Sequence, residues 1–361
     1  MFSSQTTIQN KQLRTFISLV IISLALVLTF APLPGLTRKL TIVSGTELQE
    51  PLQELAQQFE SENPQVKLEL EFMGSQDMVN RYLEDDSFDP AIIIPAEEAV
   101  LQELNSESNP FVGTPQPIAK TLLVAIAWAK RGEQLFPNSR FSWQALKKAL
   151  ELGDWHQIAN RKDWGSFEVA MTNPLRSNSA VLALDLWRKS LGYELSSSEI
   201  KDLVALVKRS IYQPARSTDI LLQEFIARGV NEADVAIVYE SIALHRWQQA
   251  QTSKGYAYQI YYPNPTVETR ATAAILNRNL DAATRRISRQ FIDFLTQSQQ
   301  QETFAKYGFR PVNENIDLKK IADSPWANNI SIKEINSQIK IFNPPDKSVR
   351  KGIQDIWQKS S

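Results

Sequence analysis

Apolar segments typical of β-strands alternate with helical patterns along most of this chain, and this alternation limits the possible folds more than any other feature. A short apolar segment at 40–43 is followed by apolar side chains at helical spacing from Leu48 to Phe59. Residues 66–72 alternate apolar and polar side chains, residues 91–94 are apolar or small, and a helical pattern follows each of them. Strands that alternate with helices predict right-handed βαβ units and a mainly parallel sheet.

The stretch 169–187 contains the most informative turn. An apolar strand at 169–171 runs into a polar, hydroxyl-rich loop at 172–179, and a helical pattern begins directly after the loop. Such a turn directs backbone N–H groups and hydroxyls at one point, where they can hold an anion or another polar ligand. Ser179 could instead be a simple N-cap that only stabilises the start of the helix.

Three other strands end in turns of the same polar kind, after residues 43, 73 and 238. In open α/β sheets, ligands bind outside the carboxyl ends of the strands, so we expect the four turns to converge on one ligand. The candidate ligand-binding residues are Ser44, Gly45, Thr46, Gly74, Ser75, Arg176, Ser177, Asn178, Ser179, Tyr239, Glu240 and Ser241.

The composition argues against several classes of function. The chain has 39 Lys and Arg against 40 Asp and Glu, a net charge of -1, and no basic cluster that would indicate nucleic-acid binding. It contains no cysteine, which excludes disulfides, thiol catalysis and thiolate metal sites, and only His156 and His245 offer imidazoles. We therefore predict no metal site, no cofactor and no catalytic centre, and an enzyme is the poorest alternative.

The N-terminus contains a hydrophobic segment. Residues 16–30 are uncharged and apolar, and Lys11 and Arg14 precede them. Counted on through Leu36, the segment reaches the roughly 20 residues that span a bilayer, and no convincing cleavage site follows it. We predict that residues 1–39 are an uncleaved membrane anchor, or else a removed signal sequence, and that the rest of the chain lies on the extracytoplasmic or periplasmic side.

The order of the predicted strands indicates two lobes in a chain of 361 residues. An apolar strand at 121–129 leaves the first lobe, and strands at 256–262 and 271–276 return toward it. The segment after Asn313 contains one amphipathic stretch, which we expect to pack loosely on a monomeric body. The predicted division is lobe one at 40–120 and 263–312, lobe two at 121–262, and a C-terminal extension at 313–361.

In chain order, the segments IVSGTELQEPLQELAQQFE, VKLELEFMGSQDM, MTNPLRSNSAVLAL and DVAIVYES resemble bacterial extracellular solute-binding proteins. The likeness is to the molybdate-binding-like branch with the type 2 periplasmic-binding fold, and it extends over about 40–312. It implies an α/β fold of two lobes with mainly parallel sheets, joined by a two-strand hinge. It also implies closure of the lobes on a small solute, which is then handed to the membrane subunits of an ABC importer.

The resemblance implies that the strand-end residues contact the solute. In family members that bind oxyanions, hydroxyls and helix-end amides hold the dianion, which makes molybdate or sulfate candidate ligands. Two charges depart from that pattern: Glu240 would repel a dianion if it faced the cleft, and Arg176 could offset this repulsion or clamp the ligand itself. Both could also be solvated loop charges. A membrane-anchored sensor or assembly domain of the same fold, with no transport role, is the main alternative.

Overall fold

The computed structural model describes residues 37–360, except 105–109, 212, 232, 256–257, 279, 314 and 329–338. The predicted N-terminal anchor at 1–39 lies almost wholly outside the described residues. Within the described part of the chain, no helix is long and apolar enough to cross a membrane.

The first lobe is built on three parallel strands, β1 (Arg38–Gly45), β2 (Val66–Met73) and β3 (Ile92–Ile94). Apolar side chains on both faces of these strands are buried, so helices cover both faces. On one face Phe59 packs edge-on against Phe291, with ring centroids 5.1 Å apart. The flanking helices and turns are η1 (Thr46–Leu48), α2 (Gln49–Glu62), α3 (Ser75–Glu84), α4 (Glu98–Leu101), η2 (Gln102–Leu104) and α13 (Ala282–Leu295).

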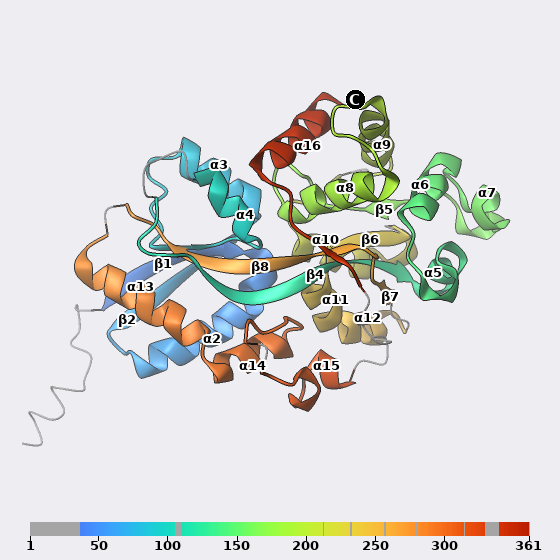
Figure 1. Ribbon diagram of the computed structural model, residues 1–361. Coiled ribbons are helices and arrows are strands. Elements are labelled where there is room, and N and C mark those ends of the chain that lie inside the picture. The colour runs from blue at the N-terminus through green and yellow to red at the C-terminus, as the bar shows by residue number, and fades with distance from the viewer. Residues whose placement is uncertain are drawn as a thin grey trace, which may run out of the picture.

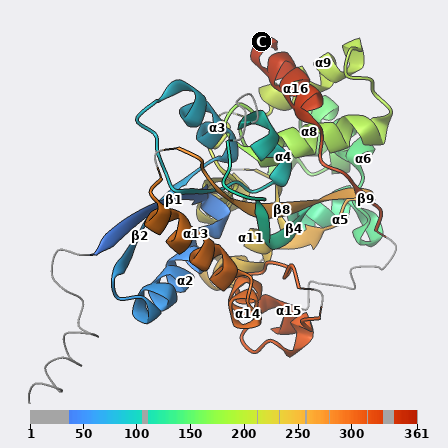
Figure 2. The same ribbon diagram turned by 60° about the vertical axis from the view of Figure 1, so that its left-hand side comes forward.

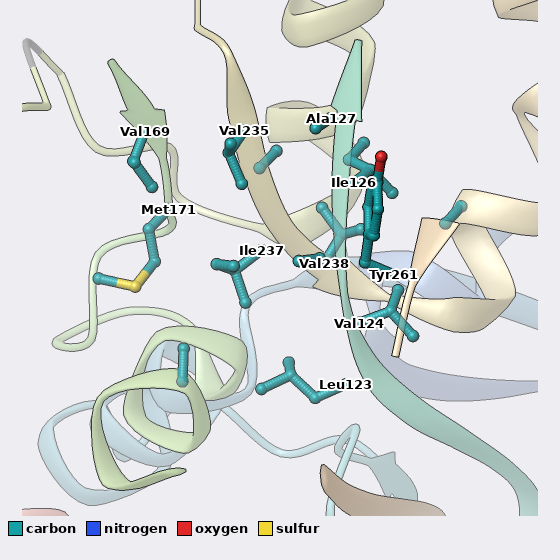
Figure 3. Packing of buried hydrophobic residues seen from close by; sticks show 14 of the residues in the cluster. Leu123, Val124, Ile126, Ala127, Val169, Met171, Val235, Ile237, Val238 and Tyr261 are labelled. Carbon is teal, nitrogen blue, oxygen red and sulfur yellow. The ribbon is translucent and has the colours of Figure 1, made fainter. Parts of the chain in front are cut away.

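The second lobe has its own apolar core, built on β5 (Val169–Ala170), β6 (Val235–Tyr239) and β7 (Tyr258–Tyr261). Figure 3 shows side chains of these strands packed against the neighbouring strand β4 (Gln116–Trp128). The helices and turns of this lobe are α5 (Ala129–Leu135), η3 (Pro137–Ser139), α6 (Trp143–Leu152), α7 (Trp155–Ala159), η4 (Lys162–Trp164), α8 (Asn178–Leu191), α9 (Ser198–Arg209), α10 (Thr218–Arg228), η5 (Gly229–Asn231), α11 (Glu240–His245) and α12 (Trp247–Lys254).

Two long antiparallel strands, β4 (Gln116–Trp128) and β8 (Thr266–Ile275), join the lobes across the middle of the molecule (Figure 1). The first half of β4 pairs with β8, its second half pairs with β6 and β7, and β8 also pairs with β3. The strand order is therefore β2-β1-β3-β8-β4-β6-β5. This connection confirms the predicted two-lobed fold with a two-strand hinge, whereas the predicted residue boundaries of the lobes stay a prediction.

The last part of the C-terminal segment, residues 347–359, is not loosely packed, so the expectation was wrong for this part. Its last helix, α16 (Lys347–Lys359), lies against α8 and α9 of the second lobe, and Ile353 and Trp357 join the second-lobe core. Charged side chains on the outer face of α16 gave the stretch its surface-like composition, while its apolar face is buried. The other elements after β8 and α13 are α14 (Ser298–Lys306), η6 (Leu318–Lys320), α15 (Pro325–Asn328) and β9 (Ile341–Phe342).

Candidate functional site

The two lobes touch where their strand ends meet. The backbone N–H groups of Gln76 and Asp77, in the first turn of α3, donate to the carbonyl oxygen of Arg176 in the second lobe at 3.1 and 3.3 Å. Gly74 is essential to this approach: a Cβ at position 74 would overlap the Arg176 carbonyl oxygen and lie 2.9 Å from that of Arg216. On the other side of the cleft, Glu50 of α2 accepts from Arg246 at 3.0 Å. The lobes are therefore in the closed arrangement.

The two charged side chains that depart from the oxyanion pattern are both paired with protein groups. The Arg176 guanidinium lies against the Asp77 carboxylate of the opposite lobe, with an Nη2–Oδ2 distance of 2.8 Å. Glu240 is fully buried and accepts from Arg310 Nε at 2.7 Å and from the Tyr262 hydroxyl at 2.8 Å. Glu240 is thus not a solvated loop charge, and its partners lie at the hinge side, where they offset its repulsion of an anion.

The hydroxyls of the turn at 172–179 form a buried cluster. The N-cap of α8 is Ser177, and its side chain makes no capping bond. Ser179 lies one residue inside the helix, with its Oγ 2.8 Å from the hydroxyls of both Thr172 and Thr218 and 3.3 Å from that of Ser177. Interpreting Ser179 as a simple N-cap was therefore wrong. Thr218 was not among the predicted site residues, because it begins helix α10, which follows no recognisable strand.

A chain of side-chain hydrogen bonds connects the two lobes through a buried polar centre. Asn178 Nδ2 donates to the Tyr239 hydroxyl at 3.1 Å, and Asn178 Oδ1 accepts from Arg350 Nη1 at 2.6 Å. Arg350 Nε in turn donates to Glu103 of the first lobe at 2.7 Å. Sequence reasoning missed Arg350, because this residue lies on the C-terminal helix and not in a strand-end turn. The only signal that could have indicated it is the amphipathic pattern of that helix, which predicts a buried face.

Two carboxyl groups also border this centre. Burial raises the pKa of both Glu47 and Glu97 to about 7, and the nearby Asp219 carboxylate adds to the rise at Glu47. Glu97 accepts from the backbone N–H groups of Ala99 and Arg270, which moderates its shift. The charges of Glu47 and Glu97 add to the burial that raises the pKa of the Tyr239 hydroxyl well above its usual range. The carboxyl of Glu47 lies over the Cα of Gly45, so a side chain at position 45 would overlap it.

Some of the predicted ligand-binding groups are already used by the fold. The Ser44 hydroxyl donates to the Ile94 carbonyl at 3.4 Å, and Ser75 Oγ accepts from the Ala96 N–H at 3.0 Å. These bonds tie the ends of β1 and α3 to the turn after β3. Both serines therefore stabilise the first-lobe wall of the cleft, in addition to any role toward a solute.

Four buried polar atoms at the strand ends and on α16 have no hydrogen-bond partner: Thr46 Oγ1, Glu47 Oε1, Ser241 Oγ and Arg350 Nη2. Buried polar atoms are almost always hydrogen-bonded, so atoms of this kind indicate a bound solute or ordered water. A cavity of about 70 Å³ is lined by two of these residues, Thr46 and Glu47, together with Asp219 and Arg246 among others. Among the described residues, no cluster of His, Asp or Glu has the arrangement needed to hold a metal ion.

A family model described as bacterial extracellular solute-binding protein matches residues 40–310. The chain belongs to this family. Its membership agrees with the fold and with a location outside the cytoplasm, and the family consists of binding proteins. This solute-binding protein matches no curated protein sequence.

Solved structures of periplasmic binding proteins share its fold. The sulfate-binding protein SubI from Mycobacterium tuberculosis H37Rv has a TM-score of 0.55 and 17% identity, and covers 84% of this chain and 94% of its own. AfuA from Actinobacillus pleuropneumoniae, with fructose-6-phosphate bound, has a TM-score of 0.62 and 16% identity. The match covers 90% of this chain and 98% of its own. The ferric binding protein from Campylobacter jejuni has a TM-score of 0.58 and 15% identity, and the match covers 89% of this chain and 99% of its own. At these identities the likeness supports the fold alone.

Proposed function

We propose that this protein captures a small polar solute between its two lobes, outside the cytoplasm, and delivers it to the membrane subunits of an ABC importer. The solute would bind where the turns after β1, β5 and β6 face one another, without any chemical change to it. The N-terminal apolar segment at 16–30 would hold the protein at the membrane surface, close to those subunits.

The observation that carries this proposal is the set of unpartnered buried atoms contributed by both lobes. Thr46 Oγ1 belongs to the first lobe and Ser241 Oγ to the second, and both are buried without a hydrogen-bond partner. A polar atom that is buried without a hydrogen-bond partner destabilises the closed arrangement by about 1–3 kcal/mol. A solute that accepts hydrogen bonds from both lobes removes this penalty only when the lobes are closed, which supports capture by closure.

A small oxyanion such as sulfate or molybdate is the first candidate solute. The cavity lined by Thr46 and Glu47 is only about 70 Å³ in the closed arrangement, which suits a compact solute. The carboxyls of Glu47 and Glu97 would repel a dianion when ionised, but with a pKa of about 7 each can bind a proton and donate a hydrogen bond instead. Proton uptake would therefore accompany binding of an oxyanion.

One observation favours a second candidate function, a membrane-held sensor or assembly domain. The family match ends at residue 310, yet α16 is docked on the body and bonded to both lobes. A helix in this position could report the state of the cleft to a partner protein. A sensor would also need a solute, so the binding test applies to both functions.

The test is a thermal-unfolding panel on the full-length chain with sulfate, molybdate, phosphate, neutral sugars and amines, at matched ionic strength. A ligand present at a hundred times its dissociation constant adds about 2.7 kcal/mol of stability. We expect one panel member to raise the melting temperature, and Thr46→Ala and Ser179→Ala to reduce its effect. Ser196→Ala, in an exposed turn, is the matched control. Absence of any shift, or a shift that both cleft variants preserve, would refute the proposed site.

A further inference from the structure

The C-terminal helix α16 contacts both lobes. Its apolar face is anchored in the second lobe, where Ile353 and Trp357 are buried, and both ribbon views show it beside α8 and α9 (Figures 1 and 2). At the end of the helix, the Lys208 side chain of α9 donates to the Trp357 carbonyl oxygen at 3.1 Å. The second lobe therefore holds α16 by apolar packing and by a terminal hydrogen bond.

Its contacts with the first lobe are polar. Gln354 Nε2 donates to Gln76 Oε1 at 2.9 Å and also to the Pro174 carbonyl oxygen of the second lobe at 3.1 Å. Arg350 Nε donates to Glu103 at 2.7 Å. Polar contacts of this kind exchange readily with water, whereas the apolar anchor does not. When the lobes separate, α16 would stay with the second lobe and keep Arg350 beside Asn178.

The guanidinium of Arg350 has N–H donors without a hydrogen-bond partner. The residue has no exposed surface, its Nε and Nη1 are used by Glu103 and Asn178, and its Nη2 has no hydrogen-bond partner. An arginine is found fully buried only when its charge and its donors are satisfied. The Glu103 carboxylate satisfies the charge in the closed arrangement, but two N–H groups of Nη2 remain unsatisfied.

The surroundings of the guanidinium include groups of the cleft. Its charge acts on the Tyr239 hydroxyl and on the Glu97 carboxyl, and Asn178 connects it to Tyr239 by hydrogen bonds. Tyr239 and Asn178 are both strand-end residues of the candidate site. The free donors of Arg350 therefore belong to the same buried polar centre as Asn178 and Tyr239.

We propose that Arg350 binds an anionic group of the solute through Nη2, so that the C-terminal helix restricts this protein to negatively charged solutes. The inference rests on the proposed function. A guanidinium donates bidentate, charge-assisted hydrogen bonds to sulfate-like, phosphate or carboxylate oxygens, and these bonds are about twice as strong as neutral ones. Because Arg350 lies beyond the family match, this determinant is separate from the strand-end turns.

The test compares dissociation constants for sodium sulfate, sodium molybdate and the neutral members of the solute panel, measured by titration calorimetry on the full-length chain. The variants are Arg350→Gln and Arg350→Lys, and the matched control is Lys351→Ala, which removes one positive charge from the exposed face of α16. Thermal unfolding without solute measures the structural effect of each substitution separately.

We expect Arg350→Gln to weaken oxyanion binding at least tenfold, which corresponds to about 1.4 kcal/mol. Arg350→Lys should recover part of that loss, and Lys351→Ala should change the dissociation constant less than twofold. If Arg350→Gln lowers the melting temperature but leaves oxyanion affinity unchanged or increased, Arg350 is only structural and the inference is wrong. Binding of a neutral sugar or an amine alone would also overturn the inference while leaving the proposed function intact. A wild-type chain that binds no panel member overturns both.

Discussion

Replacing Glu47 by glutamine isolates the energy of a buried carboxyl in the cleft. Burial raises the pKa of Glu47 from 4.5 to about 7, and its Oε1 is buried without a hydrogen-bond partner. Glutamine has nearly the same shape as a protonated glutamic acid and carries no charge at any pH. The substitution therefore removes the titration and leaves the packing largely unchanged.

The direction in which stability changes with pH follows from the number of protons bound by the folded and unfolded states. Between pH 4.5 and about 7 the folded carboxyl holds its proton and the unfolded one has released it, so the stability of the wild type falls as the pH rises through this window. Above pH 7 both states are ionised and the loss is constant. At about 1.4 kcal/mol per pH unit, the full loss is roughly 3 kcal/mol.

The assay is urea unfolding of the wild type and of Glu47→Gln at half-unit steps from pH 4.5 to 8, without solute. We expect the stability of the variant relative to the wild type to rise by roughly 3 kcal/mol across the window and then to level off. Glu62→Gln removes the same charge from an exposed position at the end of α2 and serves as the control. Parallel curves for the wild type and Glu47→Gln would refute the assignment of a buried, proton-binding carboxyl.

Three other predictions follow from the same contacts. Gly74→Ala should keep the chain folded but prevent closure of the lobes, because the added Cβ overlaps the Arg176 carbonyl oxygen. We expect a larger radius of gyration by small-angle scattering and a solute affinity reduced at least tenfold. An unchanged radius of gyration would contradict this prediction. Ile353→Ala should reduce the free energy of unfolding by about 2–4 kcal/mol, since Ile353 is fully buried; a loss below 1 kcal/mol in denaturant titration would show that α16 is not docked. Oxyanion affinity should increase several-fold from pH 8 to pH 6, because protonation of Glu47 and Glu97 removes repulsion; calorimetry that shows affinity independent of pH would exclude both carboxyls from the ligand's surroundings.

Much of the fold could be predicted from the sequence, because its signals are local. The wholly apolar strand at 92–94 and the helical pattern after Gly74 are periodicities that an α/β sheet requires, and both elements are present. The apolar runs at 121–129 and 271–276 were recognisable as strands that leave the first lobe and return to it, and they correspond to parts of the longer hinge strands β4 and β8.

The centre of the candidate site was less accessible to sequence reasoning. The strand-end turns were found because their residue types and positions are local features, and the structure brings Asn178 and Tyr239 into hydrogen-bond contact. Arg350 was missed because it reaches Asn178 across 172 positions of the sequence. The outcomes for Arg176 and Glu240 likewise depend on distant partners, Asp77 and Arg310, which no local pattern identifies.

The most direct test of the central claim is a crystal structure of the full-length protein with the solute that gives the largest thermal shift. The account predicts electron density for the solute between the closed lobes, in contact with Tyr239, Asn178 and the Nη2 atom of Arg350. A groove of about 820 Å³ in the second lobe is lined by residues of β5 and α10 and their neighbours, among them Val169, Ile220 and Ala233. Solute density in that groove, with none between the lobes, would contradict the account.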